Sequence, residues 1–198
     1  KIKKNTTVIL GGNHISSAVS DYKISLIDKN SKLPNMIVDL ENDHFDLALA
    51  GEGEFTFAEL VNGLVNNKDI SQVPGLVKRI GYRKYLINPP NRIRDLNTLP
   101  RPARHLVDME GYFKIGAFHS AKSRSKRVLS VMCSRGCPEK CTFCSTPQMW
   151  GTNTSWRTTE HIMDEISNDV RDYKIGEIQF DDDTITVNKK NLFSLCNE

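Results

Sequence analysis

Four of the five cysteines in the chain lie in the stretch CSRGCPEKCTFC, residues 133–144. Cysteine pairs form disulfides, and cysteine thiolates bind zinc and iron–sulfur clusters. The odd number of cysteines and the lack of a basic-then-apolar signal segment argue against a disulfide framework. We therefore predict a cytoplasmic protein in a reducing compartment, whose cysteines hold a metal centre.

Three of these cysteines, Cys137, Cys141 and Cys144, have the spacing C-x3-C-x2-C. Three thiolates from one short loop can converge on a [4Fe–4S] cube and leave its fourth iron open. A zinc site is one alternative, with Cys133 as the fourth thiolate, although zinc knots usually pair two separated C-x2-C units. A ferredoxin-like cluster is another, although ferredoxins space their cysteines differently. We expect Cys133, at the end of an apolar strand, to be a buried thiol.

The cysteine loop resembles that of the radical S-adenosylmethionine (SAM) enzymes, and Phe143, just before the last cysteine, matches their pattern. The resemblance implies that Cys137, Cys141 and Cys144 hold a [4Fe–4S] cluster and that SAM binds its open iron, close to Phe143. It further implies that an electron from the cluster cleaves SAM to a 5′-deoxyadenosyl radical. The partners would be a small-molecule substrate and an electron donor such as flavodoxin or ferredoxin.

Three aspartates, Asp181, Asp182 and Asp183, end an apolar run in EIQFDDDTIT. Carboxylates suit an ammonium group, and the carboxyl ends of strands are where α/β proteins build their sites. The run resembles the E-x-x-F-x-D-D-x-x-T segment of one large radical SAM subgroup, which implies that the aspartates help to bind SAM. A solvated acidic turn that caps the next helix is the alternative.

Two pairs of glycines follow expected strands in the first third of the chain: Gly11 with Gly12, and Gly51 with Gly53. Glycine lets a backbone approach a bulky ligand closely. The segments VILGGNHIS and LALAGEGEFTFAEL resemble consecutive segments of cobalamin-binding domains fused to radical SAM barrels. The resemblance implies that these four glycines contact cobalamin. A nucleotide-binding loop is the generic alternative, but no third glycine completes the dinucleotide fingerprint.

Three further positions stay without a firm role. The D-x-H-x-x-G motif, which supplies the lower cobalt ligand in the resembling family, does not occur in this sequence, and His14 is a weak substitute. The stretch WGTNTSWR resembles the tryptophan- and arginine-containing region of the same subgroup. We expect Trp156 to pack in the core and leave Arg157 open between packing and catalysis.

Strands and helices alternate along the chain, which predicts an α/β fold. A helix is expected to begin near Thr56, with Glu59 completing a T-x-x-E capping box, and another to be capped by Thr158. Prolines interrupt the middle of the chain, where VPGLVKR and RKYLINPP predict a short hairpin. Strands are expected at 6–10, 47–50, 127–133 and 177–180.

The resemblance divides the chain into three parts. Residues 1–66 would be the C-terminal part of a Rossmann-like cobalamin-binding domain, 67–125 a basic, proline-containing linker, and 126–198 the first βαβ portion of a partial radical SAM β/α barrel. A complete barrel needs about 200 residues or more. We therefore expect the chain to be an internal fragment of a longer enzyme.

The excess of positive charge is concentrated in the linker, where residues 67–125 carry 12 basic and 4 acidic side chains. A basic patch can attract nucleic acid, but aromatic residues that would stack on bases are sparse. We predict a solvated connector and no nucleic-acid partner. No apolar run approaches the length that crosses a bilayer.

The expected function is that of a radical SAM enzyme that cleaves SAM at a [4Fe–4S] cluster and depends on cobalamin. Its reaction would be methyl transfer to an unreactive carbon or an oxidative cyclisation, as in the resembling family. Two other classes remain as alternatives: an iron–sulfur electron-transfer protein that does not cleave SAM, and a zinc-stabilised nucleic-acid-binding module.

Overall fold

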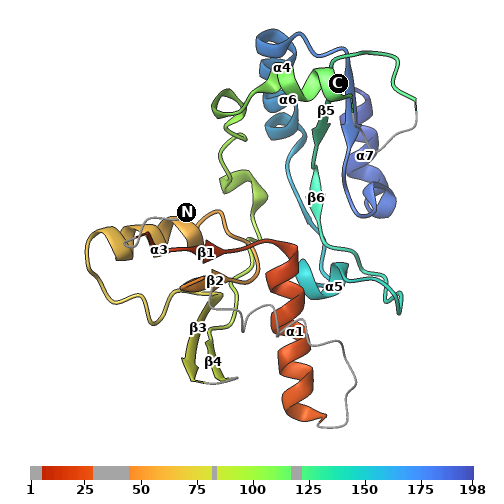
Figure 1. The fold of residues 1–198 in the computed structure, drawn as a ribbon. Helices are drawn as coiled ribbons and strands as arrows, with labels where there is room; N and C mark the ends of the chain where they lie inside the picture. Colours follow the sequence, from red (N-terminus) through yellow and green to blue (C-terminus); the bar gives the residue numbers. More distant parts are fainter. Residues whose placement is uncertain (1–5, 29–44, 82–83, 117–121) are drawn as a thin grey trace. The chain divides into compact units, whose positions relative to one another are not determined.

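The computed structural model describes residues 6–28, 45–81, 84–116 and 122–198 (Figure 1). These residues form two compact units, each of which combines two separate stretches of the chain. The first unit lies within 1–93 and 140–151, and the second within 94–139 and 152–198. Within the described ranges, no helix is both long enough and apolar enough to cross a membrane.

The first unit contains a four-stranded sheet in the order β1-β2-β3-β4. Strands β1 (Ile9–Leu10) and β2 (Leu47–Leu49) are parallel, whereas β3 (Leu76–Gly81) and β4 (Lys84–Ile87) form an antiparallel hairpin. Both the parallel pair and the hairpin were expected from the sequence. The hairpin is part of the sheet, because β3 pairs with β2, although its residues fall within the expected linker.

Helices cover both faces of this sheet. Side chains alternate along β2, so that Leu47 and Leu49 pack towards α3 (Thr56–Val65), while Ala48 packs towards α1 (Asn13–Ile27). The small alanine side chains allow α1 to lie close to the sheet. Helix α1 was not expected, because its apolar stripe is narrow and its first turn is polar.

The predicted capping box at the start of α3 is wrong. The backbone is already helical at Phe55, and the amide of Phe57 donates to the carbonyl of Gly53 over 2.8 Å. Thr56 is therefore inside the helix, where its hydroxyl donates to the carbonyl of Glu52 over 2.9 Å. The helix begins one residue earlier than the motif indicates, so the threonine cannot cap it.

The second unit is built on two parallel strands, β5 (Val128–Val131) and β8 (Glu177–Phe180). They are connected through α6 (Thr159–Tyr173), and the predicted cap is confirmed because the hydroxyl of Thr158 accepts from the amide of His161. Ile162 of α6 packs with Val131 and with Leu195 of α7 (Lys189–Cys196) in one buried cluster. The strand–helix–strand order expected for this part is confirmed.

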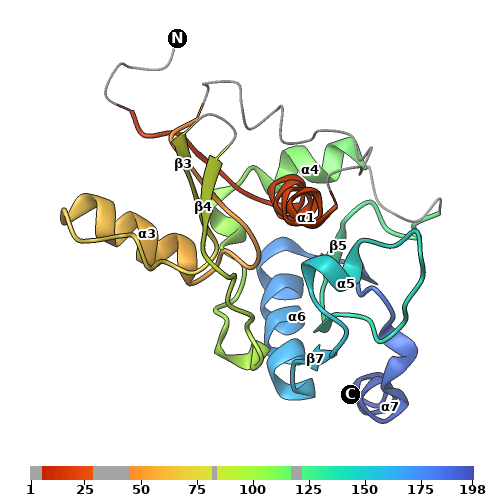
Figure 2. The same cartoon turned by 90° about the horizontal axis from the view of Figure 1, so that it is seen from below.

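Short elements complete the two units. An antiparallel pair, β6 (Ser134–Arg135) and β7 (Ser155–Trp156), closes the loop that carries the cysteines. Helix α5 (Thr146–Met149) lies within that loop and packs against α1 of the first unit (Figure 1, Figure 2). In the described ranges, the remaining elements are α4 (Met109–Ile115) and three 3-10 turns, η1 (Leu96–Thr98), η2 (Arg104–Leu106) and η3 (Ile185–Val187).

Candidate cofactor sites

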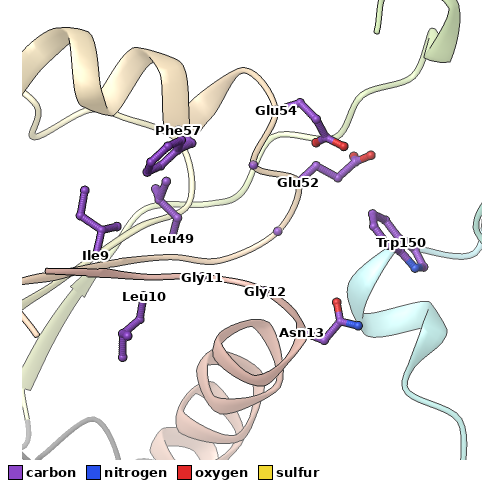
Figure 3. Close-up of a pocket in the computed structure, with 12 residues that line it drawn as sticks. Ile9, Leu10, Gly11, Gly12, Asn13, Leu49, Glu52, Glu54, Phe57 and Trp150 are labelled. Atoms are coloured by element: carbon purple, nitrogen blue, oxygen red, sulfur yellow. The ribbon is translucent and has the colours of Figure 1, made fainter. Parts of the chain in front are cut away.

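A cavity of about 440 Å³ opens where the parallel strands β1 and β2 end (Figure 3). Gly11, Gly12, Gly51 and Gly53 all line it. The structure thus brings together the two pairs of glycines that the sequence singled out. They lie at the carboxyl edge of the parallel strands, which is where α/β proteins bind ligands.

The hydroxyl of Ser16 ties the two glycine loops together. It accepts a hydrogen bond from the amide of Gly51 at 3.0 Å and donates to the carbonyl of Gly12 at 3.3 Å. Ser16 lies one turn into α1, directly behind the first glycine pair. Sequence reasoning missed this role, since it depends on a partner far away along the chain.

The four glycines serve different purposes. Gly12 and Gly51 have positive φ angles of 87° and 86°, which side chains rarely adopt. A Cβ at Gly51 would lie 2.6 Å from the Cβ of Pro90, so this glycine is also required by packing. A Cβ at Gly12 or Gly53 would meet nothing within 4 Å. At these two positions the bare backbone borders open space.

Apolar side chains form one end of the cavity and polar ones the other (Figure 3). Glu52 is 6% exposed, and its carboxylate accepts from the amide of Ile93 at 2.7 Å. Glu52 therefore anchors the chain that leaves β4 and is also one of the residues that line the cavity. The residues that accompany the glycines are Ile9, Leu10, Asn13, Leu49, Glu52, Glu54, Phe57 and Trp150.

The three predicted cluster ligands are free thiols in different environments. Cys137 is buried in the second unit, with its Sγ 3.5 Å from the hydroxyl of Thr184. Cys141 is exposed and Cys144 half-buried, and both belong to the first unit. Among the described residues, no three His, Cys, Asp or Glu side chains are gathered so as to hold a metal ion. Phe143 is 91% exposed.

Cys133 is completely buried beside the end of β5. Burial, and to a smaller extent the nearby carboxylate of Asp182, raises the pKa of its thiol to about 12. Thiolates rather than thiols bind metals, so this environment is unsuited to a ligand. The expectation of a buried structural thiol at Cys133 is confirmed.

Asp182 holds the start of the cysteine loop. Its carboxylate accepts hydrogen bonds from the amide of Cys133 at 3.1 Å and from the hydroxyl of Ser134. Burial raises the pKa of Asp182 despite these two bonds, which act in the opposite direction. The neighbouring aspartates differ: Asp181 is half-buried, and its amide donates to Val131, whereas Asp183 is exposed.

Arg157 also secures the end of β5. One of its guanidinium nitrogens donates to the carbonyl of Met132 at 3.0 Å, and another forms an ion pair with Glu165 at 2.6 Å. Glu165, in α6, also pairs with Arg104 at 2.8 Å. The structure therefore places Arg157 in a buried support of the strand, and Trp156 lies in the core as expected.

No family model matches the chain, but individual proteins do. An uncharacterised methyltransferase of Pyrococcus horikoshii is 30% identical over 98% of this chain and 43% of its own length. Cytidylyl-2-hydroxyethylphosphonate methyltransferase of Streptomyces wedmorensis is 30% identical over 74% of this chain and 32% of its own. The cobalamin-dependent radical SAM methyltransferase TokK of Streptomyces tokunonensis is 26% identical over 89% and 24%. The chain thus spans less than half of each of these relatives.

Solved structures show the same fold. The cobalamin-dependent radical SAM enzyme OxsB, solved with aqua-cobalamin and SAM, matches 96% of this chain and 23% of its own at a TM-score of 0.67 and 16% identity. The radical SAM methyltransferase TsrM of Kitasatospora setae, solved with cobalamin and a [4Fe–4S] cluster, matches 98% and 33% at 0.65 and 18%. The chain belongs to the family of cobalamin-dependent radical SAM enzymes, of which it spans a part.

Proposed function

We propose that this chain is the cofactor-binding part of a cobalamin-dependent radical SAM enzyme. A corrinoid would bind in the glycine-lined cavity, and Cys137, Cys141 and Cys144 would hold a [4Fe–4S] cluster whose open iron takes SAM. The observation that carries the proposal is the convergence of both glycine pairs on one cavity at the carboxyl edge of β1 and β2. A relative named as a cobalamin-dependent radical SAM methyltransferase, and a solved structure with aqua-cobalamin and SAM bound, support it.

The lining of the open cavity suits one face of a large planar ligand. Its apolar end is formed by Ile9, Leu49 and Phe57, which suits a macrocycle that must leave water. At Gly12 and Gly53 the backbone borders open space that a side chain would occupy. A corrinoid can therefore approach the loops closely.

The number and spacing of the thiols in the loop support an iron–sulfur cluster with three protein ligands. Cys137, Cys141 and Cys144 are free, while the raised pKa of Cys133 keeps the fourth thiol neutral. A zinc site with four thiolates would require Cys133 as a ligand, so this environment counts against the zinc-stabilised alternative. Three thiolates would leave one iron open for SAM.

The cluster and SAM, when bound, supply the one-electron chemistry, and the corrinoid supplies a carrier for a methyl group. The chain positions them. Asp182 and Arg157 fix the backbone at the end of β5, from which the cysteine loop departs. Ser16 holds the two glycine loops at a set distance from one another. Asp181, Asp183 and Phe143 remain the proposed contacts of SAM, with Asp182 both a contact and a support.

The division into a cobalamin-binding part at 1–66, a linker at 67–125 and the start of a barrel at 126–198 belongs to the same proposal. So do a small-molecule substrate, an outcome of methyl transfer or oxidative cyclisation, and an electron donor such as flavodoxin or ferredoxin. Methylation is favoured by the relatives, several of which are named methyltransferases. The alternative is an electron-transfer protein that does not cleave SAM, and an experiment must distinguish it from a radical SAM enzyme.

The deciding experiment is anaerobic reconstitution with iron and sulfide, followed by EPR of the reduced protein with and without SAM. A [4Fe–4S]⁺ signal that changes when SAM is added would establish an open iron. An EPR signal that does not change when SAM is added would favour the electron-transfer alternative. Bound zinc without iron would overturn the proposal.

The corrinoid half of the proposal has its own test in Gly53→Leu. Because a Cβ at Gly53 would meet nothing within 4 Å and the residue has no positive φ, we expect the variant to fold normally. A leucine there would narrow the cavity, so the Kd for hydroxocobalamin should rise by about tenfold, the scale of a lost contact of roughly 1.4 kcal/mol. Glu59→Leu, at an exposed position of α3 outside the lining set, is the control.

A further inference from the structure

Trp150 lines the glycine cavity but does not come from the glycine loops. It lies at the end of α5, a few residues after the last cluster cysteine, Cys144. Its indole is at the opposite end of the cavity from Ile9, beside Glu52 and Asn13 (Figure 3). The segment that follows the cysteines thus supplies a wall of the proposed corrinoid site.

The fold itself places this indole. The amide of Trp150 donates to the carbonyl of Thr146 at 2.8 Å, which closes the turn of α5. The next residue, Gly151, has a φ of 76°, and a Cβ there would lie 2.8 Å from a guanidinium nitrogen of Arg92. Helix α5 packs on α1, whose first turn carries Ser16. The position of Trp150 is therefore set by the same elements that set the glycine loops.

A second cavity adds to the open space around Trp150. It measures about 260 Å³ and shares Gly51, Glu52 and Trp150 with the first. Lys23 and Arg92 also line this second cavity and give it a basic character. Trp150 thus lines both cavities, and a ligand in the glycine cavity can reach its indole.

We propose that Trp150 is a corrinoid-contact residue, and that the bound corrinoid in turn orders the segment 145–151 behind the cluster cysteines. The inference rests on the proposed function, since it assigns the occupant of the glycine cavity. An indole offers a large rigid apolar surface that matches a planar macrocycle. Because residues 140–151 belong to the same compact unit as the cavity, contact with the ligand acts on that segment directly.

The first test is the affinity for hydroxocobalamin, measured by equilibrium dialysis with the cluster-reconstituted protein. Loss of an aromatic contact in Trp150→Ala should raise the Kd by about tenfold, whereas Trp150→Phe should stay within about threefold. Trp150→Leu keeps apolar bulk without the ring, so it remains informative if the alanine variant folds poorly. Phe193→Ala removes an exposed aromatic ring outside the lining set and should bind normally.

The second test is hydrogen exchange of the backbone amides in 145–151. Saturating hydroxocobalamin should slow their exchange in the native protein but not in Trp150→Leu. If the native protein binds no hydroxocobalamin, the proposed function and this inference both fail. If all Trp150 variants bind as tightly as the native protein, the inference alone is overturned. Unchanged exchange in the native protein at saturation would overturn the ordering of the segment.

Discussion

At the scale of single residues, Cys133 and Cys137 lie in one short stretch of sequence, but their thiols have different environments. Cys133 is completely buried in the core and its pKa is raised, whereas the Sγ of Cys137 lies 3.5 Å from the hydroxyl of Thr184. Substitution of Cys137, Cys141 or Cys144 by alanine should each abolish cluster binding. Cys133→Ala should keep the iron and lose only about 1 kcal/mol of stability. Iron and sulfide analysis with chemical denaturation distinguishes these outcomes, and loss of iron in Cys133→Ala would refute the ligand assignment.

Asp182 gives a prediction about pH. Its pKa in the folded protein lies above the ordinary value of 3.8, because burial disfavours the charged form. The folded state therefore holds this proton more tightly than the unfolded state does. The stability that Asp182 contributes is present below pH 3.8 and is lost as the pH rises through the raised folded pKa.

The variant Asp182→Asn does not titrate, so its stability should fall less than that of the native protein across this pH window. Denaturant titrations at a series of pH values from about 3.5 upward measure the difference. If the free energies of unfolding of the two proteins changed in parallel with pH, Asp182 would not be the group that causes the pH dependence. Asp183→Asn, at the exposed neighbour, provides the matched control.

At the scale of elements, a buried ion network connects η2 to α6 and the end of β5. Glu165 is 2% exposed at its side chain and pairs with both Arg104 and Arg157, while Asp169 pairs with Arg104 at 3.0 Å. Glu165→Ala leaves two guanidinium groups buried near each other without their shared partner. We expect a loss of about 3–5 kcal/mol in the free energy of unfolding.

A urea titration of Glu165→Ala beside Asp172→Ala checks this expectation. Asp172 forms an exposed pair with Arg171, so its removal should change the stability little. If Glu165→Ala also changed the stability little, the buried ion network would not contribute the expected free energy of unfolding. The same variant should also lower cluster occupancy after reconstitution, since Arg157 holds the backbone that leads into the cysteine loop.

The elements also show what sequence patterns can and cannot reveal. The apolar runs before the glycine pairs and the cap at Thr158 are local features, and the structure bears out the strands and the helix that they predict. The cysteine spacing is also a local feature, and the cluster that it predicts stays a prediction. Helix α1 was not predicted, because its apolar stripe is too weak to be recognised in the sequence alone. The helix is stabilised by packing on the sheet. The contacts of Ser16 and Trp150 join residues far apart in sequence, so no local pattern contains them.

At the scale of the whole molecule, each unit has its own core. Leu60 packs only with residues of the first unit, and Ile162 only with residues of the second, in the clusters formed by the described residues. Leu60→Ala and Ile162→Ala should each cost about 2–5 kcal/mol. Hydrogen exchange should show that each loss is confined to the amides of its own unit. Equal loss of protection throughout the chain would show that the two units unfold as one.

Neither unit is a continuous piece of the chain, because residues 140–151 complete the first one after the second has begun. During synthesis from the N-terminus, α1 therefore emerges long before α5, the helix that packs on it. Such contacts between distant segments slow folding, because a long loop must close first. The surface of α1 that receives α5 stays uncovered until the cysteine loop has left the ribosome, so a nascent chain that stalls within this loop would expose it.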